Sequence, residues 1–380
     1  MYITNIRLRN WKNFGDAATA LSGRTFLIGP NASGKSNLLD AFRFLRDLAN
    51  DGLEAAVIRR GGVSALRCLS ARRYSDIDVA VTLADDSGAD AWLYCIVFNQ
   101  DNRQRPIVKK ESVSDLKKKG PDLLSRPRQE DKDDPVRLTQ TDLEQVNANR
   151  EFREIADFFK TISYQHIIPQ VVRDPKGFSP VQVHEDPFGR DFLLRLWNTS
   201  QKTRNARLKR ISSALKVAVP HLQELAVVMD DKQGVPHLNG RYDHWRAQGA
   251  FQNESQLSDG TLRLFGLLWT VFEGNGPLLL EEPELSLHSE VVRHLPQMFE
   301  RLQKLRKTRR QIIMSTHSEE MLTDKGIGGE EVVRLEPGED GTRFQPPDEN
   351  ETKLLKQGLS VADVLLPRSA PPKAHQLSLF

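Results

Sequence analysis

Residues 29–36 read GPNASGKS, a spacing of glycine, lysine and serine that can hold a phosphate group. Glycines let backbone N–H groups wrap around an anion, Lys35 can place a positive charge on it, and the Ser36 hydroxyl can bind Mg²⁺. The flanking residues fit this chemistry. Residues 25–28 form a short apolar run expected to be a strand, and residues 37–45 carry apolar side chains at helical spacing. The sequence therefore predicts a strand, a phosphate loop and a helix that together bind ATP with Mg²⁺.

Two adjacent acids form the next group of candidate catalytic residues. The leucines at residues 278–280 are expected to form a buried strand that ends in Glu281 and Glu282. Because neighbouring residues of a strand point to opposite sides, the two acids should have different tasks. We expect Glu281 to bind Mg²⁺, directly or through water, and Glu282 to orient and polarise an attacking water. Solvated acids at a strand end are the plain alternative.

Two more elements complete this downstream group. Residues 312–315 are expected to form a second apolar strand, followed by His317, which could hydrogen-bond a terminal phosphate. A lone histidine is more often structural. An apolar helix follows Ser258, Asp259 and Gly260. Their N–H groups could bind phosphate, or the segment could be an ordinary N-cap. The sequence alone does not state which chain would carry that phosphate.

Together these motifs resemble the ABC-type ATPase heads of the SMC, RecF and OLD-like families. The opening residues agree, because the strand and turn around Lys12 and Asn13 are similar to the first strand and N-F-(K/R)-x-F turn of those families. The resemblance implies an α/β fold, namely a P-loop ATPase head of two lobes with a mixed helical and β insertion. It also implies a homodimer in which the signature motif of one chain contacts the γ-phosphate bound by the other.

The resemblance assigns roles to particular residues. The ATP-binding set comprises Gly29, Pro30, Asn31, Ala32, Ser33, Gly34, Lys35, Ser36 and Asn37, with Lys12 and Asn13 close by. The signature motif comprises Leu257, Ser258, Asp259 and Gly260; the D-loop covers residues 285–288; the catalytic set is Lys35, Glu282 and the switch histidine His317. Magnesium would be bound by Ser36, Glu281 and Gln165. Gln165 is one candidate for the Q-loop glutamine and Gln100 is a second, and for each the alternative is a plain strand residue. Glu281 stands where aspartate is usual.

Patterning divides the 380 residues into segments of one head with insertions. We expect residues 1–100 to form the first lobe, 101–160 a charged exposed insertion, and 161–255 a helical and β arm. Residues 256–340 would form the second lobe, 341–370 a C-terminal segment and linker, and 371–380 a tail. No sustained heptads occur, so the arms should be short. The residues after His317 are too few for a fused Toprim-type nuclease domain, so a nuclease or toxin effector would be a separate protein.

Charge and cysteine content bound the partners and the compartment. The net charge of +3 is too small to prove DNA binding, although basic clusters at residues 202–210 and 301–310 could contact phosphates. For the second cluster, helix-end cations on a solvated face are the favoured interpretation, whereas for the first the two interpretations are evenly balanced. Cys68 and Cys95 form no disulfide framework, and no apolar run is long enough to cross a membrane. We therefore expect a cytoplasmic protein that does not span a membrane.

The last residues form a separate motif. A proline-rich stretch at residues 367–373 is followed by a chain end that resembles the short peptide with which bacterial replication and repair proteins dock on the sliding clamp. Its anchors would be Gln376, Leu377, Leu379 and Phe380. A tail that folds back on its own head is the alternative.

These observations predict an ATPase whose heads dimerise on ATP and whose hydrolysis drives conformational change in DNA metabolism or anti-phage defence, together with a separate effector. The alternative is a nucleotide-gated DNA sensor or scaffold with very slow hydrolysis, which recruits a nuclease or toxin. An RNA- or ribosome-associated ABC protein is disfavoured, because those proteins usually carry two heads in one chain and this chain has one phosphate loop.

Overall fold

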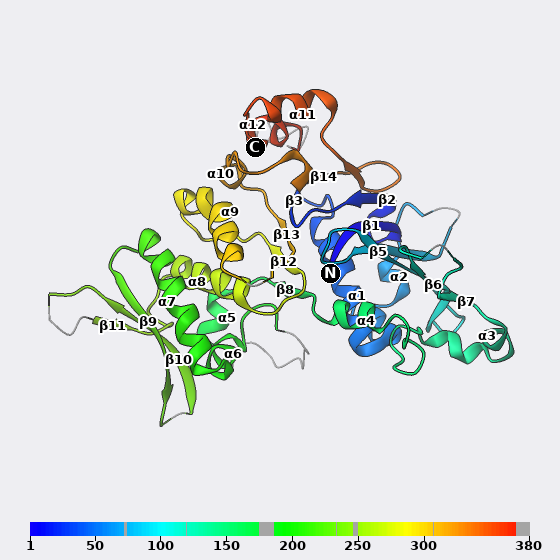
Figure 1. Ribbon diagram of the computed structural model, residues 1–380, viewed down its shortest axis with the longest axis horizontal. Helices are drawn as coiled ribbons and strands as arrows, with labels where there is room; N and C mark the ends of the chain where they lie inside the picture. The colour runs from blue at the N-terminus through cyan, green and yellow to red at the C-terminus, as the bar shows by residue number, and fades with distance from the viewer. Residues whose placement is uncertain are drawn as a thin grey trace, which may run out of the picture.

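A six-stranded antiparallel sheet forms one side of the protein (Figure 1). The computed structural model describes residues 1–71, 74–118, 120–174, 186–232, 234–245, 250–306 and 308–369. The strand order of this sheet is β2-β1-β4-β5-β6-β7. Its strands are β1 (Tyr2–Trp11), β2 (Phe14–Ala20), β4 (Ile77–Ala84), β5 (Asp90–Gln100), β6 (Pro106–Asp115) and β7 (Leu124–Arg126).

A second, mostly parallel sheet runs through the centre in the order β15-β14-β3-β13-β12-β8. Its strands are β3 (Arg24–Ile28), β8 (Ser163–Gln165), β12 (Leu278–Glu281), β13 (Ile312–Ser315), β14 (Val332–Glu336) and β15 (Arg343–Gln345). Only β15 is antiparallel to its neighbour. The register pairs Ser315 with both Leu27 and Glu281, so the carboxyl ends of β3, β13 and β12 meet at one edge. Ligands of parallel α/β sheets bind at such an edge.

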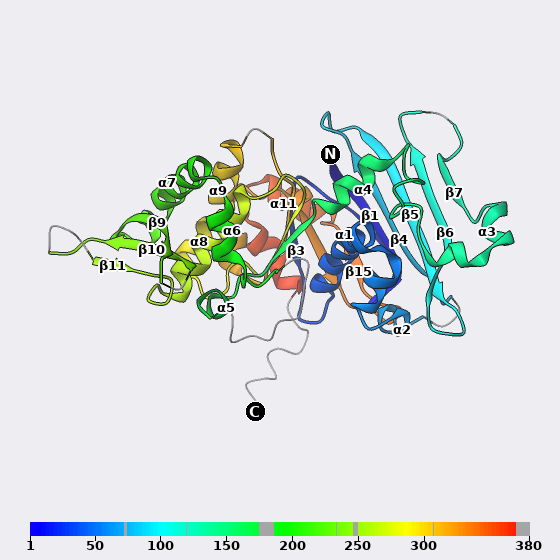
Figure 2. The same ribbon diagram turned by 90° about the horizontal axis from the view of Figure 1, so that it is seen from below.

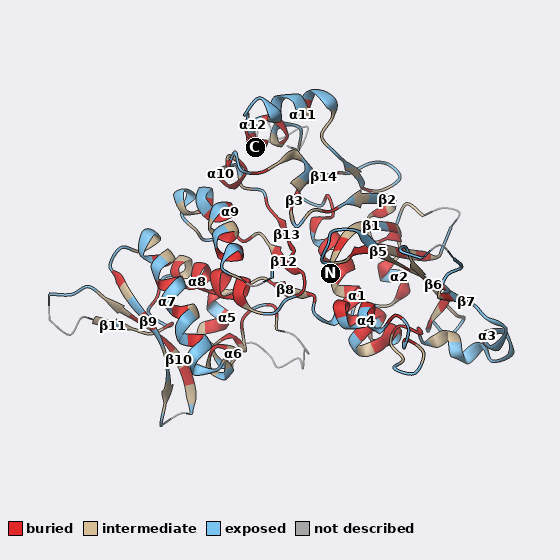
Figure 3. Cartoon of the chain, in the orientation of Figure 1, coloured by how far each residue is buried: buried red, intermediate tan, exposed pale blue. Residues whose placement is uncertain are grey.

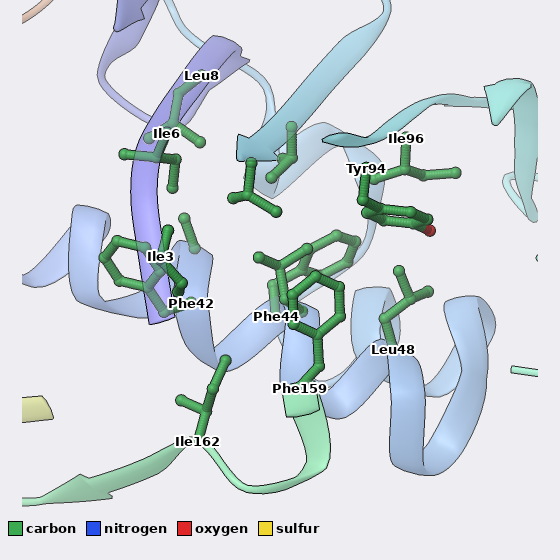
Figure 4. Packing of buried hydrophobic residues seen from close by; sticks show 14 of the residues in the cluster. Ile3, Ile6, Leu8, Phe42, Phe44, Leu48, Tyr94, Ile96, Phe159 and Ile162 are labelled. Atoms are coloured by element: carbon green, nitrogen blue, oxygen red, sulfur yellow. The ribbon is translucent and has the colours of Figure 1, made fainter. Parts of the chain in front are cut away.

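The central sheet separates two hydrophobic cores because its side chains alternate between faces. Leu27, Leu279 and Ile313 face a core shared with the antiparallel sheet and α1 (Lys35–Ile58). Figure 4 shows Phe42 and Phe44 of α1 packed there beneath Ile6 and Tyr94. Neighbouring residues such as Phe26 and Leu280 instead face the core built on α8 (Asp259–Phe272) and α9 (Ser289–Lys304). Helices α1 and α8 therefore lie on opposite faces of the central sheet.

An arm extends from the α8 side (Figure 2). It consists of α5 (Pro169–Arg173), α6 (Phe192–Asn198), α7 (Gln201–Ala218) and a three-stranded antiparallel sheet of β9 (Leu222–Asp230), β10 (Val235–Tyr242) and β11 (Ala250–Gln252). Leu208 and Leu215 of α7 share the core of Phe265 in α8, so the arm is packed onto the second lobe. Arm and second lobe form one layer over this face of the central sheet.

Residues 101–160 do not form the exposed insertion expected from their charge. They supply β6 and β7 of the antiparallel sheet, the helices α3 (Gln129–Asp133), η1 (Pro135–Thr139) and α4 (Arg153–Lys160), and the buried Phe159. The charges misled the prediction because several are buried in pairs: Arg126 bonds to Glu111 and Asp131 inside the lobe. The first lobe therefore extends well beyond residue 100.

The C-terminal segment also belongs to the head. β14 and β15 form a hairpin that crosses the expected boundary at residue 340, and α11 (Glu349–Lys356), α12 (Val361–Val364) and η3 (Leu366–Ser369) follow it. Val361 and Leu365 are buried in the second core, and Glu351 accepts hydrogen bonds from Arg334 and Arg368. Figure 3 shows buried residues within α12. The predicted clamp-binding anchors lie outside the described residues.

Three short elements connect these parts: α2 (Val63–Leu66), α10 (Glu319–Leu322) and η2 (Gly329–Glu331). None of the helices in the described ranges is both long enough and apolar enough to span a bilayer.

Candidate nucleotide site

The phosphate loop closes around the ammonium group of Lys35. Gly34, with φ 99°, precedes the first residue of α1, and Lys35 Nζ donates to the carbonyl oxygens of Gly29 (2.8 Å) and Pro30 (3.0 Å). Burial lowers the pKa of Lys35 to about 8, against the opposing pull of Glu282, Glu281 and Glu284. A buried ammonium group that bonds only to neutral carbonyl oxygens lacks a compensating charge, and a bound phosphate would supply that negative charge.

Side chains outside the loop brace it from behind. Asn13 Nδ2 and Thr342 Oγ1 both donate to the carbonyl oxygen of Ser33, at 2.9 and 2.8 Å, and Asn37 Nδ2 donates to Asn13 Oδ1 at 2.8 Å. A Cβ atom on Gly34 would lie 2.1 Å from Asn13 Nδ2, so glycine is required there. Asn13 thus contacts the backbone of the loop, and Thr342 is a supporting residue that the sequence did not reveal.

Lys12, predicted to lie near the nucleotide, forms an ion pair with Asp40 of α1 at 2.7 Å. Arg60 bonds to the same carboxylate at 3.0 Å. Together these cations hold the pKa of Asp40 below its usual value despite burial, which alone would raise it. Lys12 therefore connects the turn between β1 and β2 to α1.

Glu281 lies beside Ser36, as expected of two magnesium-binding residues. Its carboxylate accepts a hydrogen bond from the Ser36 hydroxyl on Oε1 and one from the Tyr164 hydroxyl on Oε2. The hydroxyl and carboxylate oxygens are the hard ligands that Mg²⁺ prefers, so these two residues fit the ion. Elsewhere in the described ranges, no cluster of His, Cys, Asp or Glu could hold a metal.

Gln165, predicted to bind magnesium, does not join this pair. It follows Tyr164 on β8, and successive side chains of a strand point to opposite faces. Its Nε2 lies 3.4 Å from Ser163 Oγ, and the residue lines a cavity with Asp191 and Arg195 on that other face. The group that reaches Glu281 from this strand is the Tyr164 hydroxyl, which a search for glutamine could not find.

Glu282 lies beside the switch histidine, whereas Glu281 contacts Ser36 and Tyr164, so the two acids have different partners. Strand alternation is not the reason, because β12 ends at Glu281 and Glu282 has a positive φ of 43°. Glu282 Oε1 lies 3.4 Å from His317 Nε2. Burial and the nearby Lys35 lower the pKa of His317, so its imidazole is neutral at pH 7 and can donate one N–H. The backbone carbonyl of Glu282 accepts from Arg263 Nη2 at 2.9 Å, and Arg263 Nη1 donates to the carbonyl of Ile167 at 3.0 Å. Buried Arg263 was missed, since an arginine inside an apolar helix pattern carries no motif.

The D-loop is tied to the switch histidine through Glu284. Its Oε1 accepts from Thr316 Oγ1 (2.7 Å) and from the backbone N–H of His317 (3.0 Å). Burial raises the pKa of Glu284. The third acid of the EEPE run was visible in the sequence, but only its contacts show that it orients the histidine loop.

Backbone strain is concentrated around these motifs. Among the described residues, four of the six non-glycine residues with positive φ lie here, namely Lys12 (49°), Ala32 (63°), Glu282 (43°) and Ser286 (62°); Asn10 and Gln104 are the other two. Such conformations cost about 1–3 kcal/mol each and persist only where the surrounding structure enforces them. All four belong to elements predicted to contact nucleotide, which supports their assignment to one site.

The signature residues lie at the start of α8. Ser258 Oγ caps the helix by accepting from the Thr261 N–H at 3.2 Å. A Cβ atom on Gly260 would lie 2.9 Å from the Ser286 carbonyl, so this glycine packs against the D-loop of its own chain. Because α8 and α1 lie on opposite faces of the central sheet, Ser258 and the phosphate loop do not share a face (Figure 1).

The two basic clusters are largely engaged in structural contacts. Arginines of the first lie over aromatic rings: Arg204 over Trp197, Arg207 over Trp269 and Arg210 over Phe272. In the second, Arg306 and Arg310 donate to backbone carbonyls at the end of α8. These contacts favour a structural role for most of the arginines in both clusters.

The fold and this set of motifs define a P-loop ATPase head of the ABC/SMC type. A solved SMC head bound to the C-winged helix domain of ScpA has the same fold, with a TM-score of 0.57 at 14% identity over 93% of this chain and 100% of the other. An SMC head from Pyrococcus furiosus gives a TM-score of 0.52 at 13% identity over 94% and 99% of the two chains. Residues 24–323 match the family described as "AAA domain, putative AbiEii toxin, Type IV TA system", and the chain belongs to that family.

Sequence relatives are found among bacterial RecF proteins, each described as a DNA replication and repair protein. RecF of Thermosynechococcus vestitus is 33% identical over 92 residues, which cover 23% of this chain and 24% of that protein. RecF of Corynebacterium jeikeium is 38% identical over 64 residues, or 16% and 15% of the two chains. The chain therefore aligns with at most about a quarter of either RecF protein.

Proposed function

We propose that this protein hydrolyses ATP in a homodimer that closes on two ATP·Mg²⁺ molecules and opens after hydrolysis. The observation that carries the proposal is the placement of the signature residues. Ser258 and Gly260 start a helix on the other face of the sheet from α1, yet their loop belongs to a motif set that acts on phosphate. A second chain, facing the first, would bring its own Ser258 to the phosphate that Lys35 binds.

The reaction would be in-line attack of water on the γ-phosphate. Lys35 and the loop N–H groups hold the phosphates in place, and Ser36 and Glu281 would hold the magnesium ion, which neutralises charge that develops on the phosphate oxygens. Glu282 accepts a hydrogen bond from the attacking water and orients it. His317, whose Nε2 lies 3.4 Å from Glu282 Oε1, would donate its single N–H toward the terminal phosphate once nucleotide is bound. Positioning and electrostatics supply most of the acceleration in this chemistry.

Replacing Glu282 with Gln tests both parts of the proposal. The amide keeps the shape of the side chain but orients water poorly, so turnover should fall by at least about a hundredfold, within the range expected of a lost catalytic group. ATP·Mg²⁺ should then trap a dimer that light scattering detects. If both Glu282→Gln and the wild type remain monomeric with ATP·Mg²⁺, the proposal of a nucleotide site shared between two chains is wrong.

The second candidate is a nucleotide-gated DNA sensor or scaffold that hydrolyses ATP very slowly and recruits a separate nuclease or toxin. Its support is the family, whose description includes a toxin of a toxin–antitoxin system. Steady-state turnover with and without DNA separates the two. Brisk, DNA-stimulated turnover favours the motor, whereas negligible turnover with full recruitment of a partner favours the scaffold.

We place the protein in DNA metabolism or anti-phage defence, on the strength of the RecF and SMC relatives. The chain end at Gln376, Leu377, Leu379 and Phe380 would add a contact to a bacterial sliding clamp. Deleting residues 376–380 should abolish binding to an immobilised clamp and leave ATP binding intact. Equal clamp binding by the full-length and truncated proteins, or no binding by either, refutes the docking role.

A further inference from the structure

The signature motif contains an acid at a place where a negative charge is unfavourable. Asp259 stands between Ser258 and Gly260, the two residues proposed to meet the partner's γ-phosphate. A carboxylate in the first turn of α8 suits the positive end of the helix, which explains its compatibility with the fold. The same carboxylate would repel a triphosphate brought to that helix end, because like charges in a closed interface cost affinity.

The structure holds this carboxylate in a clamp from α5. Arg173 Nη1 lies 2.5 Å from Asp259 Oδ1, and Gln170 Nε2 donates to Asp259 Oδ2 at 2.7 Å. Both oxygens are therefore engaged by neighbouring side chains. The pair is half-shielded from solvent, with 21% of the Arg173 side chain and 39% of the Asp259 side chain exposed.

The same guanidinium also fixes the backbone of the signature loop. Arg173 Nη2 donates to the carbonyl of Leu257 at 2.7 Å, and Arg173 Nε donates to the carbonyl of Glu254 at 3.1 Å. All three guanidinium nitrogens thus contact residues 254–259. A rigid planar donor set of this kind fixes both position and orientation, which an ammonium group could not do.

We propose that Arg173, assisted by Gln170, is a positioning residue that makes an acidic signature motif compatible with a partner's triphosphate. It neutralises Asp259, holds its carboxylate against α5, and leaves the exposed Ser258, whose hydroxyl also caps α8, to face the phosphate. This inference rests on the proposed function, since it assumes that the signature motif acts on the phosphate of a second chain.

The test measures ATP-dependent dimerisation in the Glu282→Gln background. Arg173→Ala should raise the protein concentration needed for half-maximal dimer by at least about tenfold, the size expected for an uncompensated like charge in an interface. Adding Asp259→Asn should restore a measurable part of the lost dimerisation, because the amide removes the repulsion although the two backbone anchors of Arg173 stay lost. Binding of a fluorescent ATP analogue to the monomer should not change, since the phosphate loop is untouched.

Three controls keep the outcome interpretable. Arg241→Ala removes an arginine that pairs with Glu224 in the arm sheet and should leave dimerisation unchanged. Gln170→Leu removes one hydrogen bond to Asp259 without touching the backbone anchors of Arg173, and should give a smaller loss of dimerisation than Arg173→Ala. It replaces Arg173→Ala in the test if circular dichroism shows that Arg173→Ala does not fold. Raising the salt concentration should reduce the difference between Arg173→Ala and its parent in the protein concentration needed for half-maximal dimer, because salt screens exposed charges.

The outcomes separate this inference from the proposed function. If the Glu282→Gln parent does not dimerise, the shared site itself is wrong. If the parent dimerises and Arg173→Ala does so equally well, the clamp has no role. If Arg173→Ala is impaired and Asp259→Asn fails to restore it, Arg173 only anchors the loop, and the charge-neutralising role is refuted.

Discussion

Replacing Tyr164 with Phe removes one hydroxyl from the magnesium side of the site and little else. The Tyr164 hydroxyl donates to Glu281 Oε2, while Ser36 donates to Oε1. The aromatic ring stays in the first core and beneath the guanidinium of Arg43, whose Cζ lies 4.3 Å from the ring centroid. Phenylalanine keeps both packing contacts, so the substitution isolates the hydrogen bond.

The magnitude follows from the charge of the acceptor. A hydrogen bond to an ionised group contributes about 1.5–3 kcal/mol. Glu281 stands where aspartate is usual in related heads, and its longer side chain has one more rotatable bond to restrain. Without Tyr164, Glu281 keeps Ser36 as its partner but loses the contact that fixes its second oxygen. Losing a group that orients a metal ligand typically lowers metal affinity or activity by about 10- to 100-fold.

The assay is ATP turnover as a function of Mg²⁺ concentration, with ATP binding measured in parallel. Tyr164→Phe should shift half-saturating Mg²⁺ upward by about tenfold or more. The matched control is Tyr94→Phe, which removes another buried phenol hydroxyl that donates to a carboxylate, Glu111, at 3.2 Å. Tyr94→Phe should lower stability without changing the magnesium dependence. A Tyr164→Phe protein with the magnesium dependence of the wild type refutes the reasoning, because Glu281 would then need no second partner.

Three further predictions test the loop and the first lobe. ATP affinity should stay constant between pH 6.5 and 7.5 and weaken about tenfold per pH unit above pH 8, because unbound Lys35, with its pKa at about 8, must regain a proton to bind phosphate. Titration of a fluorescent ATP analogue measures this affinity, and Lys35→Arg should remove its dependence on pH. Gly34→Ala should weaken ATP binding at least about tenfold through left-handed strain and a clash with the amide that braces the loop. Gly62→Ala, at another glycine with positive φ but with open space around it and outside the loop, should not weaken ATP binding. Arg126→Met should lower the free energy of unfolding in urea by about 3–5 kcal/mol, as expected when a buried carboxylate loses its cation. Burial raises the pKa of Glu111 to about 7, so this carboxyl favours the folded state when protonated and the Arg126→Met deficit should be smaller at pH 5.5 than at pH 8.

The local motifs were readable because each depends on a short run of residues. The loop of residues 29–36, the leucine strand and the helix start at Ser258 formed where they were predicted, except that the strand ends at Glu281 and does not include Glu282. Their chemistry lies in glycine conformations, strand alternation and helix caps, which span only a few residues. The predicted fold and family of the head were confirmed by the match to the family and by the similarity to a solved SMC head.

Misassignments arose where charge was taken to mean exposure. Residues 101–160 appeared exposed in the sequence, yet Glu111 and Arg126 lie buried as a pair and β6 extends the antiparallel sheet. The boundary at residue 340 divided the β14–β15 hairpin, and the segment after it is held to the head by the ion pair of buried Glu351 with Arg334. A charged residue can be buried only where a distant partner compensates it, and the sequence does not show which partner that is.

The sequence by itself determined the phosphate loop, the strand that delivers Glu281 and the order of the motifs, because neighbouring backbone groups dictate these features. Only the tertiary structure decided which side chains support them. Tyr164 reaches Glu281, Arg263 reaches the carbonyl of Glu282, and Arg173 reaches Asp259, each from another helix or strand. The parallel sheet brings Tyr164 to Glu281, since β8 and β12 are neighbours in the sheet although more than a hundred residues separate them in the chain. The physical reason is that hydrogen bonds and ion pairs act over a few ångströms, whereas sequence spacing records position only along the chain.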